Sequence, residues 1–267
     1  SYDTSDMSQT MQPGEIVTRK NVRHRAIKDL LVGCLPLAAV TVSTQFFLGL
    51  PQTSYSIGNL ALYLLLCAVI IITLPSNLPP PGLGVPNRIT LFRGMLVISV
   101  TTLAMLSSVL PEKTRWWIIG ISTIALILDG VDGQVARRSN TATSYGARFD
   151  MELDAFLMLV LSVLIWRNGI IGAWILLIGT ARYIFVGAGW LWPALARELP
   201  VSKRRKCICV VQGVVLLVCL GPVIPVTVST AAASTALVLL TASFGADTWW
   251  LLKFNKKGST HQWDTRH

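Results

Sequence analysis

The sequence predicts an all-α protein, a polytopic transmembrane helical bundle with a six-helix core and two extra N-terminal transmembrane helices. The first observation is composition: 52% of the residues are hydrophobic and 13% are charged, with a mean hydropathy of +0.59, whereas soluble domains carry about 25% charged residues. The second is a series of eight apolar segments of the length that crosses a bilayer. The third is the uneven distribution of Lys and Arg among the loops that join these segments.

The N-terminal region is predicted to form an accessory hairpin ahead of the core. Residues 1–18 are polar and lack a periodic pattern, so we expect them to be disordered. A basic run, RKNVRHRAIK at residues 19–28, precedes the first apolar segment. Such a run is typical of a cytoplasmic flank, and an interfacial helix on anionic membrane lipid is the alternative. Apolar segments at about 27–50 and 57–74 complete a unit that we assign to residues 19–80.

A stretch dense in Pro and Gly, PSNLPPPGLGVPN at residues 75–87, follows the hairpin. This composition predicts a linker or a re-entrant loop rather than a helix. Residues 81–267 are then predicted to form the transmembrane core and a short cytoplasmic tail. The six apolar segments of the core run over residues 89–110, 115–137, 145–166, 169–192, 206–227 and 229–252.

The basic residues predict the orientation of the chain in the membrane. If all eight segments cross it, 18 of the 23 Lys and Arg residues lie on one side, and three lie on the other: Lys113, Arg115 and Arg167. By the positive-inside rule both termini are cytoplasmic. We expect an integral, multi-pass protein, located in the inner membrane if the cell is bacterial. The net charge of +10 does not indicate nucleic-acid binding, because the basic residues flank apolar segments and form no single patch.

The most informative stretch is DGVDGQVARRSNTATSYGARFDMELD at residues 129–154, which holds five of the 13 acidic residues. Asp129 and Asp132 are three positions apart, and Asp150 and Asp154 are four apart, so each pair shares one face of a helix. Glycines and polar residues between the pairs could turn the chain back. The pattern therefore predicts two antiparallel helices whose carboxylates face a shared cleft at the cytoplasmic side.

Carboxylates in this position need a compensating positive charge. One carboxylate at the centre of a bilayer helix costs roughly 2.5–3.5 kcal/mol, and facing carboxylates repel one another. Oxygen ligands on rigid helices suit a hard divalent cation, Mg²⁺ or Mn²⁺, and such ions usually serve phosphate chemistry. Solvated aspartates at two helix ends are the alternative. Glu152 lies about 200° from Asp150 around a helix, so we leave it out of the site.

A longer pattern in the same stretch resembles the signature of the CDP-alcohol phosphotransferase (phosphatidyltransferase) family. The signature reads D-x-x-D-G-x-x-A-R, eight residues, then G-x-x-x-D-x-x-x-D. The chain meets it without departure at Asp129, Asp132, Gly133, Ala136, Arg137, Gly146, Asp150 and Asp154. Eight fixed positions at fixed spacing make the resemblance specific. It covers residues 85 to about 252 and leaves out the first 80 residues.

The resemblance implies a metal-dependent enzyme that acts on a CDP-linked donor. An acceptor hydroxyl attacks the phosphorus nearer the donor alcohol, and CMP leaves. The four aspartates are implied to hold two Mg²⁺ or Mn²⁺ ions, and Asp154 is implied to take the acceptor proton as well. Gly133, Ala136 and Gly146 are expected to let the nucleotide approach closely, and Arg137 to neutralise phosphate. The alternative for Arg137 is an anchor on the cytoplasmic side.

A second motif, PNRITLFR at residues 86–93, resembles the family's P-N-x-x-T-x-x-R lead into its first core helix. Asn87, Thr90 and Arg93 lie three positions apart and form one stripe on a helix. We expect this stripe to contact the ribose or the phosphates of CDP, with Arg93 as a fork for phosphate. The alternative is an N-cap asparagine and an arginine that reaches toward the interface.

Three further arginines are tentative contacts to the phosphate of the acceptor or of a lipid. Arg182 lies within an apolar run, where a charged side chain needs a polar cavity or an acidic partner. A structural salt bridge is its alternative role. Arg204 and Arg205 belong to a KRRK cluster, for which a solvated cytoplasmic anchor is the alternative.

The substrate and the class of protein remain open in the sequence. We favour CDP-diacylglycerol as donor and a small polar acceptor, in phospholipid biosynthesis. The alternative is a CDP-aminoalcohol donor with diacylglycerol, a lipid, as acceptor. A cation transporter would also use intramembrane carboxylates, but it would spread them along a path through the bilayer. An inactive scaffold has no support, because all four aspartates are present. The family resemblance further implies a homodimer.

Overall fold

The computed structural model describes residues 19–73, 85–106, 109–138, 144–191 and 203–260. Within these ranges the chain forms eight α-helices and one 3-10 turn, and no strand, which confirms the predicted all-α class. The elements are α1 (Arg19–Leu48), α2 (Gln52–Thr73), α3 (Val85–Leu106), α4 (Glu112–Arg138), α5 (Ser144–Arg167), η1 (Ala173–Ile175), α6 (Leu176–Leu191), α7 (Lys203–Leu220) and α8 (Val226–Thr260).

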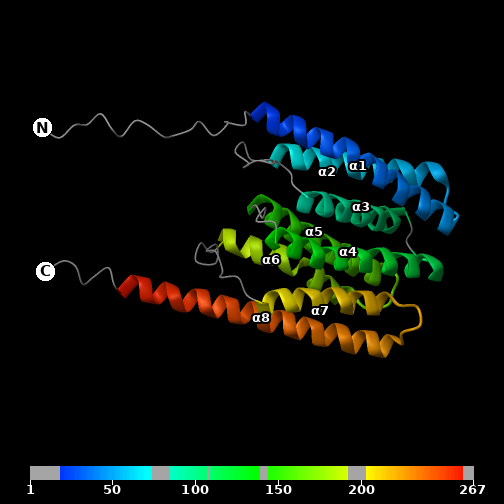
Figure 1. The fold of residues 1–267 in the computed structure, drawn as a ribbon. Helices are drawn as coiled ribbons and strands as arrows, with labels where there is room; N and C mark the ends of the chain where they lie inside the picture. Colours follow the sequence, from blue (N-terminus) through cyan, green and yellow to red (C-terminus); the bar gives the residue numbers. More distant parts are fainter. Residues whose placement is uncertain (1–18, 74–84, 107–108, 139–143, 192–202, 261–267) are drawn as a thin grey trace, which may run out of the picture.

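The helices form an up-and-down bundle, and α1 begins at the same end of the bundle at which α8 finishes (Figure 1). The hairpin of α1 and α2 packs on α3, and α3 packs on α4 and α5. On the far side of α5 lie α6 and α7, and α8 covers α7. The central helix is α3, because 78% of its apolar span is buried by its neighbours.

Five of the described helices are long and apolar enough to cross a membrane: α1, α2, α3, α4 and α8. The apolar parts of α6 and α7 are shorter, Ala173–Ala188 and Cys207–Leu220. α5 is not among the five, and it carries three acidic residues in its first half, Asp150, Glu152 and Asp154. The polytopic membrane bundle is therefore confirmed, whereas the eight full spans and their sidedness stay predictions.

Several helix ends differ from those expected; the segment predicted over residues 206–227, for example, ends at Leu220, and α8 begins at Val226. Two of the helix starts show the local cause. The loop predicted over residues 75–87 is wrong at its end, because α3 begins at Val85. Pro86 fits the first turn of a helix, where the missing N–H would have had no partner. The segment predicted from residue 169 is helical only from η1 onward, because Gly169 ends α5 with a φ of +66°. The proposed domain boundary near residue 80 lies outside the described residues.

The accessory hairpin is built into the bundle. Gly33 on α1 faces the Tyr63 hydroxyl and the methyl group of Met95 on α3 at distances that leave no room for a Cβ atom. Closer to the turn that joins α1 to α2, the Tyr55 hydroxyl lies 2.5 Å from Ser99 Oγ on α3. Both Tyr55 and Ser99 are fully buried. The hairpin thus packs on the middle of α3 through a close contact at Met95 and a hydrogen bond at Ser99, and apolar surroundings strengthen that bond.

Glycines also bring the core helices close to α5. A Cβ atom on Gly179 of α6 would lie 2.7 Å from the backbone Cα of Leu159. A Cβ atom on Gly213 of α7 would lie 2.9 Å from the end of Met158 and 3.0 Å from Leu126 of α4. This packing holds α6 and α7 against α5, which carries Asp150 and Asp154 of the site.

Candidate active site

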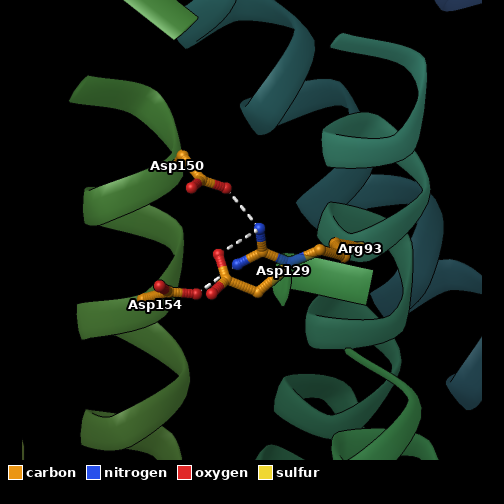
Figure 2. A network of polar contacts seen from close by, with 4 residues as sticks. All are labelled: Arg93, Asp129, Asp150 and Asp154. Atoms are coloured by element: carbon orange, nitrogen blue, oxygen red, sulfur yellow. Dashed lines mark hydrogen bonds and ion pairs between the residues drawn. The ribbon is translucent and has the colours of Figure 1, made fainter. Parts of the chain in front are cut away.

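Three of the four predicted aspartates meet at one place. Asp129 comes from the C-terminal half of α4, and Asp150 and Asp154 come from the first half of α5. One carboxylate oxygen of each lies within 4.8 Å of the other two. Asp150 and Asp154 project from one face of α5, one turn apart, toward the same point (Figure 2). The predicted geometry, with two antiparallel helices that present carboxylates to each other, is what the structure shows for these three residues.

The centre of this group is filled by Arg93 of α3. Its Nη1 donates to Asp129 Oδ1 at 3.0 Å and to Asp150, and its Nη2 donates to Asp154 (Figure 2). Arg93 is only 2% exposed, and the three carboxylates are 15–29% exposed. We call these four residues the aspartate–arginine cluster. It joins three helices through residues 36, 57 and 61 positions apart in the chain.

The cluster is not electrically balanced by its own members. Three carboxylates carry two negative charges more than one guanidinium neutralises. Removing ions from water is costly, so an excess of like charge in a partly buried site favours an added cation. In addition, Arg93 Nε is buried and has no hydrogen-bond partner in the described part of the chain. The guanidinium therefore does not satisfy this site completely.

The donor set fits Mg²⁺ or Mn²⁺. All three candidate ligand atoms are carboxylate oxygens, which hard divalent cations prefer. With metal–oxygen distances of about 2.0–2.1 Å, two ligands of one Mg²⁺ lie at most about 4.2 Å apart. The limit of 4.8 Å found here is slightly wider, and small side-chain rotations would close it. The ion and the guanidinium would then compete for the same oxygens.

Some predicted site residues have side chains outside the described part of the structure. They are Asn87, Asp132, Gly133, Ala136, Arg137, Arg204 and Arg205, and their roles stay predictions. Two others are described. Thr90 is buried on α3, one turn before Arg93, and Gly146 is half-buried in the first turn of α5. Thr90 and Arg93 thus share a face of α3, as their spacing predicts.

The contacts of Arg93 were not predicted from the sequence. The expected partner was a phosphate of CDP, whereas the structure directs both terminal nitrogens of Arg93 to aspartates. The apolar segment around Arg93 in the sequence could have predicted these acidic partners. An arginine within an apolar helix needs acidic partners, and Asp129, Asp150 and Asp154 are the carboxylates predicted to lie at the same depth.

Arg182 of α6 lies beside the cluster but does not belong to it. Its Nη2 donates to Glu152 Oε1 of α5 at 2.5 Å, and the two side chains are 31% and 52% exposed. This is the salt bridge that the sequence left open as an alternative role for Arg182. Glu152 points to α6 and away from the cluster, as its position on the helix predicts. A contact from Arg182 to phosphate stays a prediction.

Comparison with known proteins gives one family. A family model described as CDP-alcohol phosphatidyltransferase matches residues 83–245, which include all four members of the aspartate–arginine cluster. The matched range begins just before α3, so the hairpin of α1 and α2 lies outside it. No curated protein and no solved structure matches the chain.

Proposed function

Because the family model covers more than half of its length, the chain belongs to the CDP-alcohol phosphatidyltransferase family, and we propose that it moves a phosphatidyl group from CDP-diacylglycerol to the hydroxyl of a small polar acceptor. The observation that carries this proposal is the convergence of Asp129, Asp150 and Asp154 within the matched region. Such a cluster can hold a divalent cation where a diphosphate has to be bound.

We propose two roles for the aspartates, which are the binding of a divalent cation and the acceptance of a proton. Asp129, Asp150 and Asp154, together with Asp132, would hold Mg²⁺ or Mn²⁺, which neutralises charge on the diphosphate when bound. Asp154 would also accept the proton of the acceptor hydroxyl. The acceptor oxygen forms a bond to the phosphorus nearer the diacylglycerol, and the bond from that phosphorus to the oxygen of CMP breaks. CMP leaves with the electron pair of that bond.

Arg93 is proposed to hold the aspartates in place before the cation binds. Its guanidinium occupies the point that all three carboxylates face, so a cation can bind there only if Arg93 moves. A guanidinium released from the carboxylates would lie beside the phosphates, for which it is a suitable planar donor. This arrangement agrees with the phosphate contact expected from the motif that contains Thr90 and Arg93.

The donor and the acceptor are supported less directly than the chemistry. Arginines at the site and in the neighbouring helices, Arg93 and Arg182, suit a ligand that carries phosphate and lipid. We therefore favour CDP-diacylglycerol over a CDP-aminoalcohol. A cation transporter is disfavoured, because the aspartates of the cluster gather near one end of the bundle.

We further propose that the site faces the cytoplasm and that the protein is a homodimer. The distribution of Lys and Arg supports the first point, because 18 of 23 fall on the side of the cluster. A cytoplasmic site would also meet a nucleotide-activated donor where it is made. The homodimer rests on the family resemblance alone.

The test is CMP release by the purified full chain in lipid micelles. CDP-diacylglycerol and CDP-choline are supplied separately with Mg²⁺ or Mn²⁺, each against a panel of acceptor alcohols, and a chelator replaces the metal in a parallel series. We expect metal-dependent CMP release with CDP-diacylglycerol. Release with CDP-choline and diacylglycerol only would replace the proposed donor. No release with either donor, from protein shown to be folded, would overturn the proposal.

A further inference from the structure

The end of the accessory hairpin touches the beginning of the helix that carries Asp150 and Asp154. The hydroxyl of Tyr145, the second residue of α5, lies 2.9 Å from Thr73 Oγ1 and donates to the Ile70 carbonyl at 3.4 Å. Thr73 and Ile70 belong to the last turn of α2. One tyrosine hydroxyl therefore links two elements that are more than 70 residues apart in the chain.

A second contact lies one turn further along α5. Phe149 packs against a hydrophobic group that we call the hairpin cluster, formed by Leu30, Leu37, Tyr63, Ile70, Leu91, Met95 and Ile98. Tyr145 and Phe149 are four positions apart, so they share one face of α5. Asp150 directly follows Phe149. The first two turns of α5 thus contact the hairpin through Tyr145, pack Phe149 against a cluster shared by the hairpin and α3, and present Asp150 to Arg93.

The hairpin cluster also includes the neighbours of Arg93. Leu91 and Met95 lie two positions before and after it on α3, and both are buried in this cluster. The contact is tight, since Gly33 of α1 faces both Met95 and Tyr63 without room for a Cβ atom. The hairpin therefore packs against α3, which carries Arg93, and contacts α5, which carries Asp150 and Asp154, through the Tyr145 hydroxyl.

The start of α5 depends on contacts made outside the helix, as the first turn of any helix does. The first four N–H groups of a helix have no partner within the helix, and helix ends fray. Asp150 is only six residues beyond Ser144, where α5 begins. Ligands of a metal or a diphosphate must stay within about 0.5 Å of their working positions. The contact of Tyr145 with α2 adds to the Arg93–Asp150 ion pair in holding Asp150 to that tolerance.

We propose that the accessory hairpin is a positioning element for the carboxylates of α5, with Tyr145 and Phe149 as its positioning residues. It lies outside the region that the family model matches. The inference rests on the proposed function only in what the carboxylates do. The docking of α5 on the hairpin can be tested without any turnover.

The test compares Tyr145→Phe with Tyr55→Phe in the full chain. Each variant removes one hydroxyl from a contact between the hairpin and the rest of the bundle, at opposite ends of α2. We would measure Mn²⁺ binding by electron paramagnetic resonance, hydrogen exchange of the amides in residues 144–150, and kcat and KM. Tyr145→Phe is expected to weaken Mn²⁺ binding about tenfold, the effect typical of losing an outer support of a metal ligand. It should also speed exchange in residues 144–150 and lower kcat more than it raises KM.

The control, Tyr55→Phe, is expected to leave Mn²⁺ binding and exchange in residues 144–150 unchanged. Two variants of Phe149 give a parallel test. Phe149→Leu should retain Mn²⁺ binding, and Phe149→Ala, with the smaller side chain, should lose it. Unchanged Mn²⁺ binding and exchange in Tyr145→Phe would overturn the inference, as would an equal effect of Tyr55→Phe. If the unmodified chain releases no CMP, the proposed function fails, while the binding and exchange results still decide this inference.

Discussion

Arg93 Nη1 lies 3.0 Å from Asp129 Oδ1, and this ion pair joins the third turn of α3 to the C-terminal half of α4. The same nitrogen also donates to Asp150 of α5. Three helices of the matched region are therefore held together by one buried guanidinium. This arrangement places a positive charge at the point where the proposed divalent cation would bind.

Replacing Arg93 by Gln should make the stability of the protein depend on an added divalent cation, because the variant lacks the guanidinium that pairs with the three carboxylates. Removing one partner of a buried ion pair costs about 3–5 kcal/mol, so the variant should unfold more easily in a chelator. Mn²⁺ should then raise its melting temperature more than that of the unmodified chain, because no guanidinium competes for the carboxylates. Thermal unfolding measured with chelator and with Mn²⁺ gives the melting temperature of each protein and its rise on addition of Mn²⁺.

Arg93→Lys is the matched control, since it keeps the charge but cannot donate to three carboxylates in one plane. Its response to Mn²⁺ should lie between those of the other two proteins. Equal Mn²⁺-induced shifts in all three would mean that the guanidinium and the cation do not share the carboxylates.

Replacing Asp154 by Asn should abolish a proton acceptor without altering the size of the side chain. General base catalysis contributes about 10²–10⁴-fold, so CMP release should fall by at least a hundredfold. Glu152→Gln is the control on the same helix, because Glu152 points to Arg182 and away from the cluster. We expect its rate to stay within about threefold of the unmodified chain, since exposed ion pairs contribute about 0–1 kcal/mol. A comparable loss in both variants would argue against a specific role for Asp154.

The helices were predictable because each apolar segment is long enough to form a helix, and five of the described helices are also long and apolar enough to cross a membrane. The residues at which the helices begin and end were less predictable. Pro86 lies inside α3 although its neighbours suggested a loop, since a proline in the first turn loses no hydrogen bond. Gly169 shows the reverse case, in which one residue with positive φ ends a helix within an apolar run. The backbone properties of Pro86 and Gly169 set the start of α3 and the end of α5, and hydropathy does not report backbone properties.

Only the part of the site that depends on local helix geometry was predictable. Asp150 and Asp154 share a face because a helix repeats every 3.6 residues, so their spacing was sufficient. The position of Arg93 depends on how α3 crosses α4 and α5, which no local pattern contains. The hairpin's contact with Tyr145 depends on the same long-range packing. Sequence reasoning therefore reached the carboxylates but not the residues that hold them in place.

Exchanging the charges of Arg182 and Glu152 should separate a structural ion pair from a phosphate site. Arg182→Glu alone places two acidic side chains together and should lower both stability and activity. The double variant Arg182→Glu, Glu152→Arg restores the attraction between α5 and α6. If the pair is structural, the double variant should regain most of the activity and the original KM. A KM that stays high in the double variant would instead assign Arg182 to the binding of phosphate.

Replacing Gly179 by Ala should weaken the contact that seats α6 on α5. The new Cβ atom would lie 2.7 Å from the Cα of Leu159 and 2.7 Å from Ser162 Oγ, and a backbone atom cannot move aside cheaply. Overpacking of this kind costs about 1–3 kcal/mol, so the melting temperature should fall. Gly120→Ala on α4 is the control, because a Cβ atom there meets nothing within 4 Å. Alanine is the better helix former by about 1 kcal/mol, so this variant should be unchanged or more stable. A Gly179→Ala protein as stable as Gly120→Ala would show that α5 and α6 can separate without cost, and that the close crossing does not hold α5 against its neighbours.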